Sequence, residues 1–232
     1  MKRENAAADA DPESVRLSID TKAVINLGPH SRGGLSRGPR PVAAVDHDLM
    51  AKEKLVPGGV LELGRSRTFL FFTESCKTSD FMVDGIHLWW RENQGCLAGS
   101  KRLVINLDNG PEGSGHRRQF WRRLVAFADR EELEVRLLYS PPYHRKYHGI
   151  ERYWGGLERA WNGYLLASVA GVLLRASQFF RRSARTTSTL LKGVYRKGVK
   201  LCGQEKQGLE KRLSRSNDLP WWDITIQPLM LI

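Results

Sequence analysis

Three carboxylic acids stand at positions where metal-binding side chains are commonly placed. Asp20 ends an apolar stretch, Asp108 ends the run Arg-Leu-Val-Ile-Asn-Leu, and Glu151 opens a helical pattern after a proline-rich turn. Carboxylate oxygens are the ligands that Mg²⁺ prefers, and two such ions can activate a nucleophile and stabilise the leaving oxygen of a phosphodiester. If the three acids converge, they predict metal-dependent phosphodiester chemistry.

Each acid also has a simpler explanation. Asp20 fits a solvated turn, Asp108 begins an Asp-Asn-Gly-Pro tight turn, and Glu151 fits a first helical turn, where the helix dipole favours negative charge. Asp46 and Glu158 are the nearest alternative ligands, since Asp46 also follows an apolar stretch and Glu158 lies about two helical turns after Glu151. The prediction therefore rests on the combination of acids.

The elements that must position these acids alternate between strand and helix patterns. Apolar or alternating runs favour strands at residues 15–27, 41–45, 59–72, 102–108 and 135–139. Apolar residues at helical spacing favour helices at residues 78–93, 116–130 and 150–174. This order predicts an α/β fold in which a mixed sheet is flanked by helices. We expect the strands that end in Asp20 and Asp108 to be neighbours in that sheet.

Length and composition fit one main domain with short appendages. The chain has 232 residues, of which 41% are hydrophobic. We expect a flexible lead-in at residues 1–14, the α/β domain at 15–180, and a basic, mainly helical extension at 181–232. No apolar run approaches the roughly 20 residues of a membrane-spanning helix. The polar N-terminus lacks a signal-peptide pattern, and three scattered cysteines without a CxxC pair predict a reducing, cytoplasmic environment.

The positive charge of the chain favours a polyanionic partner. The net charge is +12, and residues 181–215 alone carry eleven Lys and Arg against two Glu. Such a stretch predicts phosphate contacts that do not depend on sequence and weaken with salt, although a solvated surface is the alternative. The candidate DNA-binding residues share a basic side chain near the acids or in this stretch: Arg32, Arg37, Arg117, Arg118, Lys146, Arg181, Arg182 and Lys197.

Two further patterns have simpler readings than a functional site. His144 and His148 lie four residues apart, but the prolines before them and the glycine after them argue against a helix. No Cys or further His lies nearby to complete a site, so zinc is disfavoured. Trp154, Leu157 and Trp161 recur at helical spacing, and they predict the buried face of the helix that begins near Glu151.

Three sequence blocks, in this order, resemble the signature blocks of a family of insertion-sequence transposases, the Rhodopirellula transposase DDE domain. The blocks read LSIDTKAVINLGPHSRGGLSR, LVINLDNGPE and YSPPYHRKYHGIERYWGGLERAWNG. The resemblance implies an RNase H-like fold for residues 15–180. It also implies that Asp20, Asp108 and Glu151 form the metal-binding catalytic triad, with Mg²⁺ as the metal and Mn²⁺ as a substitute. DNA would be the partner, at element ends and target, and the chain would act as a homo-oligomer.

The chain departs from the family pattern in two places. Gly149 replaces the proline that usually precedes the Glu151 helix, which loosens the start of that helix. Members also usually carry a helix-turn-helix region before the catalytic domain, so the chain resembles an N-terminally shortened member. The leading interpretation is an enzyme that cleaves and transfers DNA strands. The alternatives are a non-catalytic DNA-binding remnant and a stand-alone RNase H-like nuclease.

Overall fold

The computed structural model describes residues 1–36, 40, 42–45, 51–140, 148–182 and 184–229. The strands are β1 Ser14–Thr21, β2 Ile25–Asn26, β3 Lys54–Glu62, β4 Arg67–Thr73, β5 Arg102–Leu107, β6 Glu134–Tyr139, β7 Phe180–Arg181, β8 Ala184–Leu190, β9 Leu213–Arg215 and β10 Asp223–Ile226. The helices are α1 Lys2–Ala10, α2 Ser79–Asn93, α3 Arg118–Glu131, α4 Gly149–Trp161, α5 Val169–Ser177 and α6 Gly203–Glu210, and the 3₁₀ turn η1 covers Gln94–Cys96.

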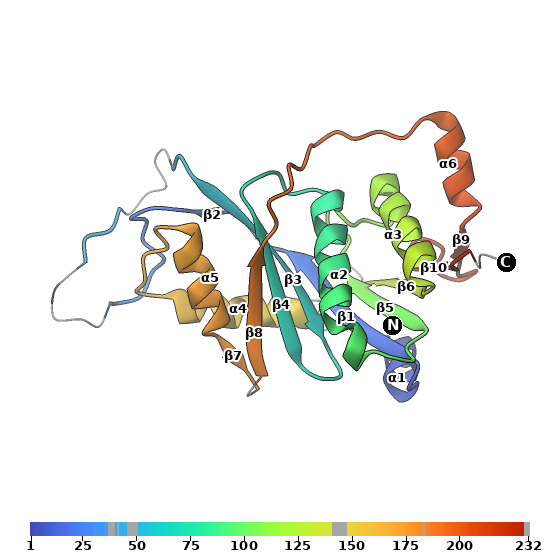
Figure 1. Ribbon diagram of the computed structural model, residues 1–232, viewed down its shortest axis with the longest axis horizontal. Coiled ribbons are helices and arrows are strands. Elements are labelled where there is room, and N and C mark those ends of the chain that lie inside the picture. The colour runs from blue at the N-terminus through green and yellow to red at the C-terminus, as the bar shows by residue number, and fades with distance from the viewer. Residues whose placement is uncertain (37–39, 41, 46–50, 141–147, 183, 230–232) are drawn as a thin grey trace.

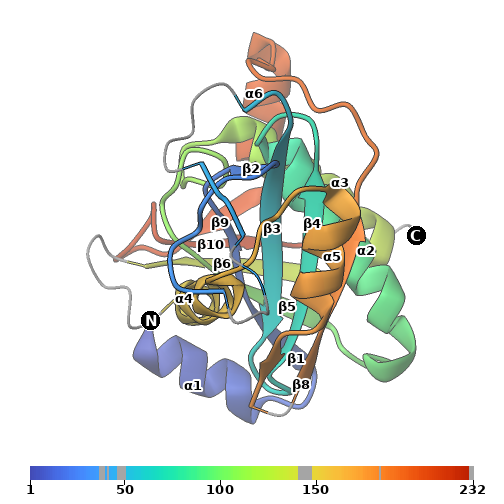
Figure 2. The same cartoon turned by 90° about the vertical axis from the view of Figure 1, so that its left-hand side faces the viewer.

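The strands form one ten-stranded mixed sheet with helices on both faces (Figures 1 and 2). The strand order is β7-β8-β4-β3-β1-β5-β6-β10-β9, and β2 pairs with β3 off this path. The central strand β1 runs antiparallel to β3 and parallel to β5, and β5 runs parallel to β6. The predicted α/β fold with a mixed, helix-flanked sheet is therefore confirmed.

The register of the two central parallel strands brings the first two acids to one end of the sheet. Ser18 of β1 pairs with Asn106 of β5, so two residues further along each strand stand Asp20 and Asp108. We call this end, where β1 and β5 finish, the acidic end of the sheet. Strand β8 also finishes there, because its last residue, Leu190, pairs with Phe72 near the end of β4.

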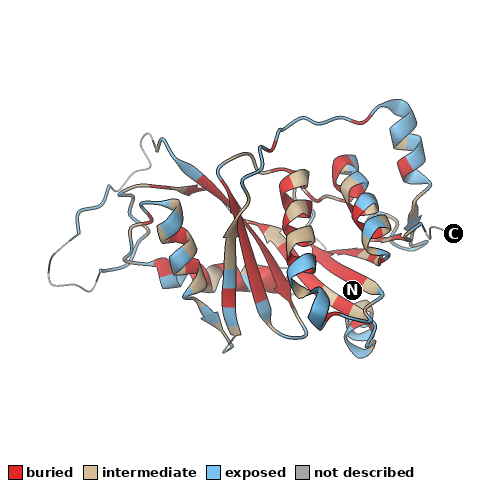
Figure 3. Cartoon of the chain, viewed as in Figure 1, coloured by how far each residue is buried: buried red, intermediate tan, exposed pale blue. Residues whose placement is uncertain are grey.

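The core is divided by the sheet into two layers, which Figure 3 shows as buried segments of strand and helix on either side. In the larger layer, alternate residues of β1 and β5 pack against α2 and α3, with Phe81 and Phe120 fully buried. In the smaller layer, β3 and β4 pack against α4 and α5. Trp154, Leu157 and Trp161 belong to this second layer, which confirms the predicted buried face of their helix.

The N-terminal residues differ from the flexible lead-in that the sequence predicts. Lys2–Ala10 form α1, a helix of low hydrophobicity whose Ala8 packs on Val104 and Leu138. Asn5 accepts a hydrogen bond from Asn106 at 2.9 Å, which ties the helix to β5. Tertiary contacts therefore determine that this segment is helical, because its apolar pattern is too weak to predict a helix.

The C-terminal residues differ from the mainly helical extension predicted for 181–232. Among the described residues of this range, α6 is the only α-helix, whereas β8, β9 and β10 are strands. Ala184–Leu190 is rich in threonine, which favours strands, and it pairs in parallel with β4. Asp223–Ile226 pairs antiparallel with β6. The extension thus completes both sides of the central sheet instead of forming an appendage.

The strand predicted at residues 41–45 is also absent from the part of that range that the structure describes. Residues 42–45 contain only an isolated bridge between Val45 and His30. These residues are exposed, so their apolar character alone is insufficient for a strand.

Gly85 marks the closest approach of α2 to the sheet. A Cβ at this position would lie 2.3 Å from the ring of Phe71, which is fully buried. We expect Gly85→Ala to lower the free energy of unfolding by about 1–2 kcal/mol, because overpacking outweighs the better helix propensity of alanine. Urea denaturation would measure this. Gly155→Ala in α4, where a Cβ meets nothing within 4 Å, is the control and should be neutral or stabilising. Equal stabilisation of both variants would contradict the proposed packing.

Candidate active site

Asp20 is held in place at the acidic end by two hydrogen bonds. Its Oδ1 accepts from the backbone N–H of Thr21 at 2.7 Å, and its Oδ2 accepts from Nε1 of Trp154 at 3.1 Å. Gly59 pairs with Asp20 across the β1–β3 ladder, and a Cβ there would lie 3.0 Å from the Trp154 ring. The glycine thus leaves the space through which α4 reaches the Asp20 carboxylate.

Asp108 follows β5 directly and begins a tight turn. Its Oδ1 accepts from the backbone N–H of Gly110 at 3.1 Å, a typical side-chain contact for aspartate in a turn. The pKa of Asp20 is raised to about 6, first by burial and then by the negative charge of Asp108, against the opposing charges of His148 and Lys77. The two acids therefore lie close enough to repel each other, as two carboxylates in a shared site do.

Glu151 lies in the first turn of α4, and the start of this helix is fixed to β1. The backbone N–H of Ile150 donates to Oγ of Ser18 at 3.2 Å. His148, just before the helix, is buried, and its Nε2 lies 3.0 Å from the carbonyl oxygen of Ile19. Its Nδ1 lies 3.5 Å from Oε1 of Glu151. The ring of His148 thus lies between the backbone of Ile19, next to Asp20, and the carboxylate of Glu151.

The three predicted catalytic acids lie in one region, but Glu151 is related to the two aspartates only through other residues. Asp20 and Asp108 are neighbours across the sheet, and Glu151 joins them through the helix that carries Trp154 and through His148. Within the described part of the chain, no three His, Cys, Asp or Glu side chains are grouped closely enough to hold a metal ion. The placement of the triad as metal ligands stays a prediction.

The alternative carboxylates have different outcomes. Glu158 forms an ion pair with Lys22, with 3.0 Å between Oε1 and Nζ, so it has a structural partner at the helix surface. Asp46 lies outside the described residues, as do His144, Arg37 and Lys146. Of the two histidines considered for zinc, His148 is described, and its ring contacts a carbonyl and a carboxylate.

Three residues near the acids are not identified as site residues by sequence patterns. Lys77 donates to the carbonyl of Thr21 at 3.3 Å and lies 3.6 Å from Glu112, so its positive charge stands at the acidic end. His148 and Trp154 contact the acids as described above. In the sequence, Trp154 shows only the spacing of a buried helix face, and nothing in the spacing of Lys77 indicates a site. The contacts of these two residues with Asp20 and Thr21 depend on long-range packing, which local patterns do not reveal.

The two candidate DNA-binding residues at the start of α3 have different surroundings. Arg118 lies 4.0 Å from Glu210 of α6, a contact between exposed side chains. Arg117 is half-buried just before the helix, and its Nε has no hydrogen-bond partner. Arg123, further along α3, bridges Asp80 and Asp84 of α2.

The remaining candidates occupy different places. Arg32 lies over the ring of Trp161 with its Cζ 5.6 Å from the centroid. Arg181 and Arg182 lie in and just after β7, at one edge of the sheet. Lys197 is exposed in the segment that joins β8 to α6. The structure therefore spreads these cations over several surfaces.

These observations define the class of protein. A mixed central sheet flanked by helices, with acids at the ends of neighbouring strands and on an adjoining helix, is the architecture of an RNase H-like domain. Residues 1–228 match the family described as Rhodopirellula transposase DDE domain, and the chain belongs to this family. No curated protein matches the chain. The resemblance and the fold predicted from the sequence blocks are therefore confirmed.

Membership of the family also bears on partners. The family implies that DNA is the substrate. No helix in the described residues is long and apolar enough to span a membrane.

Proposed function

We propose that this chain cleaves and transfers DNA strands during movement of an insertion sequence, and that Asp20, Asp108 and Glu151 bind the divalent metal for that reaction. The observation that carries the proposal is the position of Asp20 and Asp108 at the ends of adjacent parallel strands, where the charge of Asp108 raises the pKa of Asp20. Two partly buried carboxylates that repel each other have an evident counter-charge in a divalent cation. Membership of a DDE transposase family supports the same chemistry.

The donor set fits a hard cation. Carboxylate oxygens suit Mg²⁺, with Mn²⁺ as a substitute. When bound, the metal supplies activation of the attacking oxygen and charge stabilisation of the leaving oxygen. Asp20 and Asp108 would hold it from the sheet, and Glu151 from the helix.

The surrounding residues orient these acids. Thr21 and Trp154 fix the two oxygens of Asp20, and the Gly110 N–H fixes one oxygen of Asp108. His148 lies against Glu151, with 3.5 Å between its Nδ1 and Oε1 of the glutamate. Such fixed side chains keep a reacting phosphodiester in line, which is a large part of how phosphoryl-transfer sites work.

A basic segment leaves the sheet beside the acids and is the best candidate for contact with the DNA backbone. Residues 191–202 connect β8 to α6 and run along the outside of α2 and α3 (Figure 1). Buried Tyr195 anchors the segment, since its backbone N–H and carbonyl both contact Ser75. Exposed cations surround this anchor: Lys192, Arg196, Lys197 and Lys200.

Deleting residues 181–215 is not a clean test of DNA binding, because that range contains β8 and the Arg212 side chain that pairs with Asp129. We therefore predict the effect of Arg196→Gln combined with Lys197→Gln. DNA affinity should fall, and the slope of log affinity against log salt should flatten by up to about two, since each phosphate contact contributes about 0.9. Fluorescence anisotropy with a labelled duplex at several salt concentrations would measure both.

The matched control is Arg65→Gln combined with Arg67→Gln. Both arginines are exposed, and Arg65 lies in the turn before β4 while Arg67 begins β4, so both lie at the sheet end opposite to Asp20. The control removes the same charge and should leave the salt slope near that of the wild type. Equal slopes in the two double variants would show that the 191–202 segment is only a solvated surface.

A further inference from the structure

A partly exposed aromatic stack stands beside the proposed active site and has no role in the fold-wide core. Trp221 is 46% exposed, and His116 is exposed. Their ring centroids are 4.5 Å apart with 34° between the planes. Arg215 lies against Trp221 at 4.7 Å and against buried Trp121 at 4.8 Å. The stack therefore runs from a core tryptophan outwards to a histidine at the surface.

The stack is rigidly supported. The guanidinium of Arg215 donates to the carbonyl of Pro220 at 2.9 Å, and the carbonyl of Trp222 accepts from the N–H of Tyr139 at 2.8 Å. A Cβ at position 115 would lie 2.4 Å from the carbonyl oxygen of Trp221, so Gly115 is needed for the close approach of the two loops. Exposed aromatic side chains that are held in this way lose little conformational entropy when they bind a ligand.

The stack lies at the acidic end of the sheet. Leu107, just before Asp108, pairs with Tyr139 of β6, and Tyr139 in turn bonds to Trp222. Trp222 is thus two strand spacings from β5, which is about 10 Å, or about three base-pair steps of B-DNA. His116 belongs to the loop that follows Asp108, and Asn109 secures that loop by accepting from the N–H of Gly115 at 3.0 Å.

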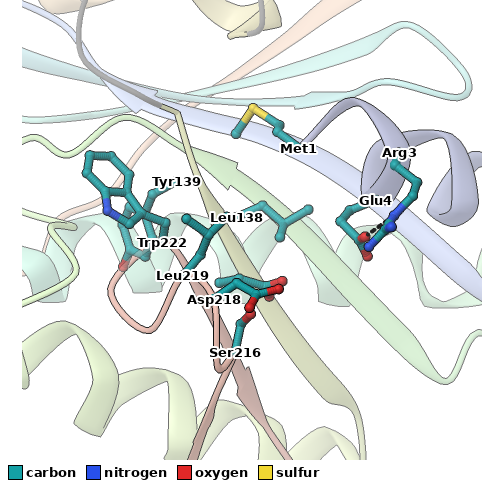
Figure 4. A pocket seen from close by; sticks show the side chains of 10 residues that line it. Met1, Arg3, Glu4, Leu138, Tyr139, Ser216, Asp218, Leu219 and Trp222 are labelled. Carbon is teal, nitrogen blue, oxygen red and sulfur yellow. Dashed lines mark hydrogen bonds and ion pairs between the residues drawn. The ribbon is translucent and has the colours of Figure 1, made fainter.

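The two sides of the Trp221–Trp222 loop differ in charge. A pocket of about 600 Å³ opens between α1 and the loop before β10, and His116 is not among the residues that line it (Figure 4). Its walls include apolar Leu138 and Leu219, the acids Glu4, Asp218 and Asp223, and Arg3, and Arg136 pairs with two of these acids. Acids thus outnumber bases around the pocket. On the His116 side, Arg215, Arg117 and Arg118 outnumber Glu210, which pairs with Arg215 and Arg118, so this side suits a DNA strand better.

We propose that Trp221 and His116 form a platform on which an unpaired base of the DNA strand stacks, a short distance from the phosphate that reacts at Asp108. Every base has a π-face, so aromatic stacking holds a single strand without reading its sequence. The net charge of +12 brings DNA to the chain, and the platform selects an unpaired base. This inference rests on the proposed function, since it places the base beside the proposed catalytic acids.

The test uses a DNA duplex with a four-nucleotide 3′ overhang in which one base at a time is 2-aminopurine, in a buffer with EDTA. We expect quenching of 2-aminopurine when the wild-type chain binds, at one overhang position above all. Trp221→Ala should abolish the quenching and weaken overhang binding about tenfold, while blunt-duplex binding stays unchanged. Trp221→Phe should retain most of the signal, and His116→Ala should reduce it.

The control is Phe180→Ala, which removes an aromatic ring that is 58% exposed in β7, at the opposite edge of the sheet. This variant should quench and bind as the wild type does. Full quenching by Trp221→Ala, or no quenching by the wild type at any position, would overturn the platform. Neither result would contradict the proposed function, because this binding assay contains no metal. The catalytic acids are tested separately, by metal-dependent cleavage.

Discussion

Replacing Asp108 with asparagine is expected to reduce metal-dependent DNA strand cleavage by several orders of magnitude. Asparagine keeps the size of the side chain, and its oxygen can still accept from the N–H of Gly110, so the turn after β5 should survive. The substitution removes the charge that holds a hard cation. Activation of the attacking oxygen and stabilisation of the leaving oxygen both depend on that cation.

DNA binding by Asp108→Asn should persist or become tighter, because one negative charge near the phosphates is lost. Cleavage of a radiolabelled DNA substrate with Mg²⁺ or Mn²⁺, alongside anisotropy of the same substrate, separates the two effects. Glu158→Gln is the matched control, since Glu158 lies on α4 but pairs with Lys22, and it should cleave like the wild type.

Two outcomes would change the assignment. Equal cleavage by the wild type and Asp108→Asn would show that the catalytic acids are misassigned. A wild-type chain that binds DNA and never cleaves it with either metal would support the non-catalytic DNA-binding alternative.

The sequence predicts the elements of the active-site region well, because their patterns are strong and local. The apolar run before Asp108 and the helical spacing of Trp154, Leu157 and Trp161 each satisfy one periodicity over several residues. By contrast, no local pattern specifies the pairing of Ser18 with Asn106, which brings Asp20 close to Asp108. This pairing depends on packing between strands about ninety residues apart.

The elements that the sequence misses are those whose stability comes from distant partners. Lys2–Ala10 is helical because Asn5 and Ala8 meet β5 and β6, and Ala184–Leu190 is a strand because β4 offers it an unpaired edge. Charge patterns mislead for the same reason. Arg118 is a candidate DNA-binding residue by its charge, yet its guanidinium lies 4.0 Å from Glu210 of α6.

The raised pKa of Asp20 has a consequence for stability in the absence of metal. Burial, and then the charge of Asp108, raise this pKa from 3.8 to about 6. The folded state therefore binds more protons than the unfolded state between these values. The free energy of unfolding should fall as pH rises through this window, and the loss should be complete above about pH 6. At 1.36 kcal/mol for each pKa unit, the ionised carboxylate costs about 3 kcal/mol at neutral pH as an upper estimate.

Asp20→Asn should consequently raise the free energy of unfolding at pH 7.5 by about 1–2 kcal/mol, when EDTA removes divalent ions. The gain is smaller than the full cost, because asparagine offers one acceptor oxygen where Thr21 and Trp154 both donate. Near pH 4 the wild-type carboxyl is protonated in the folded state, and the gain should disappear. Urea denaturation at the two pH values measures the difference.

Asp129→Asn is the control with the opposite sign. Burial would raise the pKa of Asp129, but hydrogen bonds from Arg212 and the Leu229 N–H lower it overall, so its charge stabilises the fold above the unfolded pKa. This variant should lose stability at pH 7.5. Added Mg²⁺ should then stabilise the wild type and leave Asp20→Asn unchanged, because binding to the folded state alone raises its stability. A wild type that is indifferent to Mg²⁺, or an Asp20→Asn variant that is less stable than the wild type at pH 7.5, would mean that Asp20 serves the fold and not a metal.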